Sequence, residues 1–453
     1  MSTTNKSDVQ GNLRTITERT LLAIAFVIAA LEGYDLAVYG VSVPALLGDT
    51  SLNVDKASAG ALGSVVGAGM LIGAGLAGAL MRRIGALRLI LASCLVFSAG
   101  MLISAVAQNV VLFGAGRALV GLGLGIVLPT LLAYVADLSV PQHRNRNTGI
   151  VMAGYAAGGL AAPLLGAALL PATSFRWLYI IGVLPVLVIL PFAWKLLPVP
   201  PVHLLRIGQT AQAHRMSEAM GLPTPVLALA GKRHLAGIGP LFSPGVGVAT
   251  LLFWMMTFCG LLLVFGITAW LPTMMQASGY SLGSALLQTA AMWIGVAVGV
   301  IIGGRIADAI GAKPVVVVAF LTGAVSLLVM SLNPNVVVLF IFMFLSGVGF
   351  IGSQILVNGF ILTRYPDDIR GSGLAWALSF GRMGAIVGPS LGAWVMTSGL
   401  SVEWNFYAFA IPAVIGAFAS VLVPQVKVKA AAVPAPELPA QELPALKVPA
   451  PKA

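Results

Sequence analysis

Two short stretches match each other across the chain: GALMRRIGAL at residues 78–87 and GRIADAIGAK at residues 304–313. Each stretch joins two long apolar runs. Their shared letters lie 226 residues apart, and the same offset aligns three further groups: Gly121 and Gly123 with Gly347 and Gly349, Arg144 with Arg370, and Pro163, Gly166 and Ala167 with Pro389, Gly392 and Ala393. One constant offset in four regions predicts a chain of two homologous halves.

The composition places these halves in a lipid bilayer. Of the 453 residues, 58% are hydrophobic and only 9% are charged, whereas soluble domains are about one quarter charged. The apolar runs are continuous and about 20 residues long, which predicts membrane-spanning α-helices and excludes the alternating pattern of a β-barrel. Twelve spans are expected, six in each half, near residues 20–47, 58–81, 87–107, 110–136, 147–169, 176–197, 245–275, 283–308, 314–332, 335–362, 370–398 and 403–424.

The net charge of +11 indicates membrane topology rather than nucleic-acid binding. If the N-terminus is cytoplasmic, 21 of the 25 Lys and Arg residues lie in cytoplasmic segments, as the positive-inside rule requires. We therefore expect a multi-pass protein of a bacterial-type cytoplasmic (inner) membrane with both termini in the cytoplasm. The polar first 19 residues and the long first span indicate an uncleaved anchor rather than a signal peptide.

Five segments are expected along the chain. The segment between the halves is richer in Pro, His, Lys and Arg and has no long apolar run, and the last segment is rich in Pro and Ala, a composition typical of disorder. The segments are a cytoplasmic N-terminal segment (1–19), an N-terminal six-helix half (20–197), a cytoplasmic linker (198–244), a C-terminal six-helix half (245–424) and a disordered Pro/Ala-rich cytoplasmic tail (425–453).

The first span carries two acidic residues, in the stretch LEGYDLAVYG at residues 31–40. At 3.6 residues per turn, Glu32, Asp35 and Tyr39 share one helix face. A carboxylate at the bilayer centre costs about 2.5–3.5 kcal/mol, so acids in spans face the bundle interior and mark ion or proton paths. Arg117 of the fourth span lies at a compatible depth, and a nearby arginine changes the proton affinity of a buried acid. Asp35, Glu32 and Arg117 are the expected proton-coupling residues; the alternative is that they only tie helices together.

The stretch at residues 304–313 follows the pattern G-x-L-A-D-x-x-G-x-K, and on this basis the chain resembles the major facilitator superfamily. The resemblance, together with the repeat, implies the all-α major facilitator fold, with a midplane site that opens alternately to each side. Gly304 and Gly311 permit a tight turn and close helix approach, and Asp308 can face a helix N-terminus of the other half. We expect these three residues to gate the cytoplasmic side; the first half has Arg82 where the pattern has an acid.

Within that superfamily the chain resembles the aromatic acid:proton symporters along nearly all twelve spans. The stretches that carry the resemblance are LEGYD (31–35), similar to that family's D-G-x-D with Glu32 at the first Asp position, RALVGLGLGIVLP (117–129), TAWLPTMMQASGYS (268–281) and GSQILVNGFILTRYPDDIRGSGLAWALSFGRMGAIVGP (352–389). The last is the most specific, because its Gln, Asn, Tyr-Pro and Gly-Arg fall at the family's spacing. The resemblance implies proton-coupled uptake of an aromatic carboxylate such as benzoate or 4-hydroxybenzoate.

Polar side chains of the second half are candidates for binding that carboxylate. Arg382 is the second cation within a span and can hold a carboxylate through two parallel hydrogen bonds; alternatively it pairs with a first-span acid. Gln354 and Asn358 lie four residues apart on one face and can bond a ring hydroxyl or carboxylate, or merely join helices. Tyr39 and Trp270 are expected to supply aromatic walls.

The expected function is therefore transport of an aromatic carboxylate with protons through the lipid bilayer, by a monomer without metal or cofactor and without a nucleic-acid partner. A carrier of another organic anion (a dicarboxylate or sugar acid), an exporter and a membrane receptor remain as alternatives. An enzyme is not expected, because the spans contain no His and no Ser or Cys with a plausible base. Cys94 and Cys259 are interpreted as packing residues. No catalytic residue is predicted.

Overall fold

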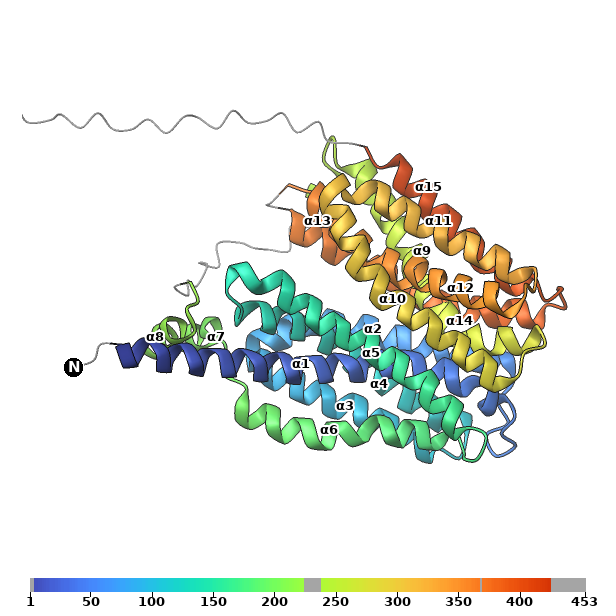
Figure 1. Cartoon of the computed structure of the whole chain (residues 1–453), viewed down its shortest axis with the longest axis horizontal. Coiled ribbons are helices and arrows are strands. Elements are labelled where there is room, and N and C mark those ends of the chain that lie inside the picture. Colours follow the sequence, from blue (N-terminus) through green and yellow to red (C-terminus); the bar gives the residue numbers. More distant parts are fainter. Residues whose placement is uncertain (1–3, 224–237, 367–368, 425–453) are drawn as a thin grey trace, which may run out of the picture. The chain divides into compact units, whose positions relative to one another are not determined.

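The computed structural model describes residues 4–223, 238–366 and 369–424, with side chains from residue 18 onward. These residues form helices and no β-strand, as the sequence predicts. The first half contains α1 (Thr4–Leu47), α2 (Lys56–Ile84), α3 (Ala86–Val106), α4 (Val110–Asp137), the short η1 (Pro141–His143), α5 (Arg144–Leu169) and α6 (Arg176–Leu196). The second contains α9 (Gly247–Ala277), α10 (Leu282–Ile310), α11 (Ala312–Ser331), α12 (Val336–Gly347), η3 (Val348–Gly352), α13 (Ser353–Arg364), α14 (Arg370–Thr397) and α15 (Trp404–Leu422). Figure 1 shows the two groups, coloured from blue to green and from yellow-green to red.

Eleven helical segments of the described chain are long and apolar enough to cross a membrane, with α12, η3 and α13 counted together. The remaining long helix, α14, has 28 residues, or about 42 Å at 1.5 Å per residue, which exceeds the roughly 30 Å hydrocarbon thickness. Its sequence is less apolar because it contains two arginines and several small residues. Together these segments form the predicted twelve spans in two halves of six.

The helix bounds repeat with the same period as the sequence. α2 and α10 begin and end 226 residues apart, and so do the starts of α3 and α11. The turns before α3 and α11 are formed by Gly85 and Gly311, with φ of 84° and 92°, values that favour glycine. The two matching stretches of sequence therefore form the same turn in two pseudo-symmetric halves.

The tenth span differs from the uninterrupted helix that the sequence predicts. Its pieces α12 and α13 are joined by η3, a π-helical turn. Gly349 of this turn lies against the backbone of Gly323 in α11 and leaves no room for a Cβ. Hydrophobic patterning did not indicate this turn, because the span is apolar throughout, and the π-helix is a rare local change of hydrogen bonding.

The largest contacts between the halves join α2 with α14, α5 with α10 and α1 with α9. Those between α2 and α14 gather at one end of the bundle, at the start of α2 and in the second part of α14. Gly60 and Gly63 lie against Pro389 without space for a Cβ, and Ser64 Oγ is 2.8 Å from Ser390 Oγ. Small residues therefore let the two helices approach to backbone contact.

The expected linker contains two helices, α7 (Pro201–Arg206) and α8 (Thr210–Met220), and the short η2 (Gly239–Phe242). The imidazole of His203 in α7 lies against Gly85, so the linker packs on the turn between α2 and α3. Residues 224–237 and the expected tail at 425–453 lie outside the described residues.

Candidate functional site

One of the two acids in the membrane-spanning part of α1, Asp35, forms a buried ion pair. Arg117 Nη1 of α4 donates to Asp35 Oδ1 at 3.1 Å, and the two side chains are 2% and 0% exposed. The other carboxylate oxygen, Asp35 Oδ2, and Arg117 Nε have no hydrogen-bond partner among the described residues. Because burying two charges is costly unless good geometry satisfies them, this pair is held by one hydrogen bond and remains incompletely satisfied.

Glycines enclose this part of α1 from two sides. Gly33 lies against the backbone of Tyr155 in α5, and Gly40 lies against the backbone of Thr268 in α9, each without space for a Cβ. Within two turns, α1 is thus packed against a helix of its own half beside Glu32 and against a helix of the other half beside Tyr39.

Tyr39 and Tyr179 flank the guanidinium of Arg117. Arg117 Cζ lies 4.9 Å from the centroid of the Tyr39 ring and 6.0 Å from that of the Tyr179 ring, distances at which the ring faces attract a cation. The Tyr39 hydroxyl donates to the carbonyl of Ala59, and the Tyr179 hydroxyl is 3.0 Å from Ser42 Oγ. The rings therefore hold Arg117 in place without neutralising its charge.

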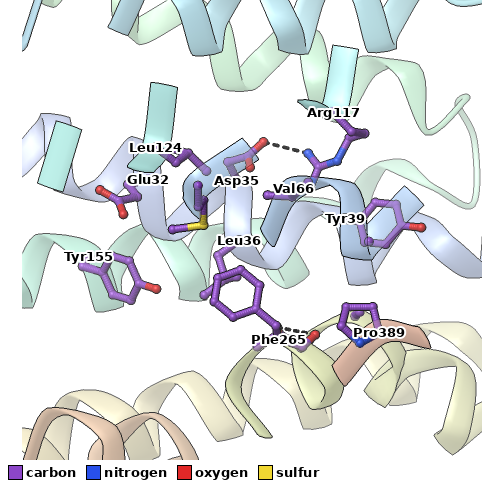
Figure 2. A pocket seen from close by; sticks show the side chains of 14 residues that line it. Glu32, Asp35, Leu36, Tyr39, Val66, Arg117, Leu124, Tyr155, Phe265 and Pro389 are labelled. Carbon is purple, nitrogen blue, oxygen red and sulfur yellow. Dashed lines mark hydrogen bonds and ion pairs between the residues drawn. The ribbon is translucent and has the colours of Figure 1, made fainter. Parts of the chain in front are cut away.

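Glu32, one turn earlier on α1, has no ion-pair partner. Its side chain is 5% exposed, its Oε2 has no hydrogen-bond partner, and no Lys, Arg or His nitrogen of the described chain lies within 4.0 Å. Figure 2 shows Glu32 and Tyr155 on one side of the site, and Asp35 with Arg117 on the other. The charges of Asp35 and Arg382 both act on Glu32.

Both halves line a small cavity between these groups (Figure 2). Its free volume is about 30 Å³, room for one or two waters and far below the roughly 300–1,000 Å³ of ligand sites. The lining residues are Glu32, Asp35, Leu36, Tyr39, Gly63, Val66, Met70, Arg117, Leu124 and Tyr155 of the first half and Phe265, Thr268, Ala269 and Pro389 of the second. An aromatic ligand would need this cavity to widen.

Arg382 of α14 lies outside that cavity. Its Nη1 donates to the carbonyl of Leu378 at 3.4 Å, and its Nε has no partner among the described residues. No acidic oxygen of the described chain is within 4.0 Å, yet Glu32 is the acid whose charge acts on it. The two residues belong to opposite halves, interact through their charges and do not touch.

Three other residues that the sequence places at the site are not brought into the cavity. Gln354 Nε2 donates to Asn358 Oδ1 at 3.1 Å on α13, so these two amides partly satisfy each other. Trp270 Nε1 of α9 donates to the carbonyl of Pro389 at 2.7 Å, and its ring lies against Gly392. The indole therefore joins α9 to α14.

We expect Trp270→Phe to lower stability and leave substrate affinity unchanged. The substitution removes the donor to Pro389, at a cost of about 1 kcal/mol, which lowers Tm by a few degrees. The measurement is Tm in detergent together with the KM of uptake, and Trp177→Phe, at a side chain 53% exposed, is the control. A several-fold change in KM at unchanged Tm would show instead that Trp270 contacts substrate.

The three expected gating residues lie at the other end of α10 from its contact with α5. Asp308 is exposed and has no hydrogen bond or ion pair within the described chain. A Cβ at Gly304 or Gly311 would meet nothing within 4 Å. In this conformation the predicted latch has no contact with the other half.

If Asp308 forms its latch in the opposite conformation, Asp308→Asn should slow uptake at least five-fold and leave Tm unchanged, because the side chain has no partner here. Initial uptake rates and Tm of the two proteins provide the comparison. Glu403→Gln, the same carboxyl-to-amide change at an exposed residue outside the spans, should alter neither. An unchanged rate in the Asp308 variant would exclude a latch through this carboxylate.

Sequence reasoning missed several residues that line the cavity, including Tyr155, Phe265 and Pro389. For two of them, the sequence contains a feature that could have indicated their position in the site. Pro389 is the repeat partner of Pro163, and Tyr155 is the only aromatic residue in the small-residue stretch AGYAAGGLAA at 153–162. Phe265 lies in a uniformly apolar stretch of α9 and has no such feature.

A sequence model described as Major Facilitator Superfamily matches residues 25–296 and 284–450. The chain is 29% identical over 409 residues to a benzoate transport protein of Acinetobacter baylyi, covering 87% of each chain. It is 31% identical over 410 residues to a gentisate transporter of Corynebacterium glutamicum, covering 89% of this chain and 87% of that protein.

Among solved structures, the fold is similar to the xylose transporter XylE of E. coli in a partially occluded, inward-open conformation. The TM-score is 0.74 at 19% sequence identity, over 91% of this chain and 99% of XylE. At this identity the likeness concerns the arrangement of helices alone.

Proposed function

Because the chain belongs to the Major Facilitator Superfamily, among its transporters of aromatic acids, we propose that it carries an aromatic carboxylate into the cell together with protons. The superfamily and these relatives consist of transporters, so the chain is a transporter and not an enzyme. Benzoate and hydroxybenzoates are the proposed substrates.

The observation that carries this proposal is the buried, incompletely satisfied pair of Asp35 and Arg117. A single hydrogen bond joins them, and each retains an unpartnered atom. A proton on Asp35 removes the negative charge that holds Arg117, so protonation and the position of α4 relative to α1 are coupled. Such an acid in a span is the kind of group that marks a proton path.

The proposed cycle follows from this coupling. In the outward-facing state Asp35 takes up a proton, and its contact with Arg117 loosens. The substrate carboxylate then binds near Arg382, whose Nε is available. With its charges compensated, the site can be enclosed as the halves rock, and proton and substrate leave on the cytoplasmic side.

Orientation supports this order of events. With both termini in the cytoplasm, the tight contact of α2 with α14 lies at the outer end, and the exposed Asp308 lies at the inner end. A tight contact at the outer end and a latch residue without a hydrogen bond or ion pair at the inner end support an inward-facing arrangement of the halves.

Uptake into proteoliposomes tests the proposal. Radiolabelled benzoate and 4-hydroxybenzoate should accumulate when an inward proton gradient is imposed and only equilibrate without it. Competition by unlabelled aromatic acids should abolish the signal. If dicarboxylates or sugar acids compete and aromatic acids do not, the substrate assignment is wrong, and accumulation driven only by a reversed gradient would indicate an exporter.

A further inference from the structure

Glu32 is a buried acid that the proposed proton cycle does not use. It lines the cavity, is 5% exposed and has a carboxylate oxygen without a partner. A buried acceptor left unpaired is costly, so a group that donates a hydrogen bond to Glu32 would bind favourably. Glu32 can therefore accept a hydrogen bond from a group that enters the cavity.

Resting on the proposed function, we infer that Glu32 is the acceptor for a ring hydroxyl of the substrate. A hydroxylated aromatic acid is then held at both ends, with its hydroxyl on Glu32 of α1 and its carboxylate on Arg382 of α14. This assigns the carrier a preference for phenolic acids over benzoate and gives the hydroxyl a defined binding partner.

The charges of the two end groups suit such a ligand. Glu32 and Arg382 each have an unpartnered polar atom, belong to opposite halves and lie more than 4.0 Å apart without an ion pair. A 4-hydroxybenzoate ion presents a donor at one end and an anion at the other, separated by the length of the ring. In the proposed pose such an ion pairs with both groups once the cavity has widened to include Arg382, whereas benzoate leaves the acid unpaired.

Aromatic side chains lie next to the acid. Tyr155 lines the cavity beside Glu32 in Figure 2, and its ring centroid is 6.0 Å from that of Trp293 in α10. The Trp293 ring lies against Gly159, where a Cβ would collide with it. These two rings from opposite halves can form a wall for a substrate ring in the range of centroid distances that aromatic pairs favour.

The other candidates for the hydroxyl fit less well. Gln354 and Asn358 bond each other and do not line the cavity. Asp35 already accepts from Arg117. Of the two acids that line the cavity, Glu32 is the one without a cation within 4.0 Å in the described chain, whereas the free Oδ2 of Asp35 belongs to a carboxylate already paired with Arg117.

Equilibrium binding of 4-hydroxybenzoate and benzoate to the purified protein tests this inference. Leaving a buried polar group unpaired costs about 1–3 kcal/mol, and about 1.4 kcal/mol corresponds to ten-fold in affinity, so the wild type should bind 4-hydroxybenzoate about ten-fold more tightly. In Glu32→Ala the ratio of the two Kd values should fall to within about two-fold, with the Kd of benzoate nearly unchanged. Glu32→Gln retains an acceptor oxygen and should keep part of the preference.

Glu403→Gln is the matched control for Glu32→Gln, because it is the same carboxyl-to-amide change at an exposed residue outside the spans. It should leave the ratio of the two Kd values as in the wild type. An equal loss of affinity for both ligands in Glu32→Ala, or a wild type that binds both equally, overturns the role of Glu32 while aromatic-acid transport stands. If the wild type binds neither ligand, the proposed function fails as well.

Discussion

Asp35→Asn should abolish proton-driven accumulation of substrate while exchange of substrate across the membrane persists. The amide keeps the shape of the side chain and can still accept from Arg117, but it cannot take up a proton. Without that step the gradient has no effect on the cycle, so the accumulation ratio should fall to about one. The measurement is uptake and counterflow in the same proteoliposomes, with and without an imposed proton gradient.

A double variant separates this role from mere stabilisation. Asp35→Asn alone leaves the buried guanidinium of Arg117 uncompensated, which costs about 3–5 kcal/mol for a buried pair and should lower Tm. Asp35→Asn combined with Arg117→Gln removes both charges and should recover much of the Tm without recovering accumulation. If the single variant still accumulates substrate against the gradient, the proton travels elsewhere, and Glu32 becomes the candidate.

Gly40→Leu should reduce uptake at least ten-fold. A Cβ at this position would overlap the carbonyl of Thr268 and lie 3.1 Å from the Cα of Ala269, so any side chain separates α1 from α9. The contact is between backbone atoms, which cannot rotate away as a side chain can. Overpacking costs about 1–3 kcal/mol, which lowers the population of the conformation with this contact by about 5- to 150-fold. The variant should therefore fold but disfavour the conformation in which the outer end is closed.

Cross-linking between α2 and α14 measures whether the two helices are in contact. The Oγ atoms of Ser64 and Ser390 are 2.8 Å apart, so cysteines at these positions should cross-link in the wild-type background and much less with Gly40→Leu. Gly75→Leu is the control, because a Cβ at Gly75 meets nothing within 4 Å. Unchanged cross-linking and uptake in the Gly40 variant would mean that this contact is not part of the transport cycle.

Sequence analysis located the helices well because the bilayer imposes a length on each span and the repeat imposes a period. The bounds of α2 and α10 repeat at the offset read from a few glycines, and Asp35 and Arg117 were matched by depth alone. The first deduction uses the repeat offset, and the second uses depth along the helix axis. Neither requires knowing how the helices of one half pack against those of the other.

The positions of the other predicted site residues depend on how the helices pack. Trp270 lies on an apolar helix, and only the structure shows that its indole reaches Pro389 rather than a ligand. Gln354 and Asn358 share a helix face, as spacing predicts, but the face is not turned to the cavity. Asp308 has no hydrogen bond or ion pair within the described chain, and a sequence pattern does not say in which conformation a partner would come within reach.

The hydrogen bonds between α2 and α14 can be compared with the energy that a proton gradient supplies. The interface between the two helices consists of glycine, proline and serine contacts, and within the described chain no ion pair crosses it at this end. Its few hydrogen bonds contribute about 0.5–1.5 kcal/mol each. One elementary charge crossing 100 mV supplies about 2.3 kcal/mol. The hydrogen bonds between α2 and α14 are thus of the same order of energy as one proton crossing such a potential.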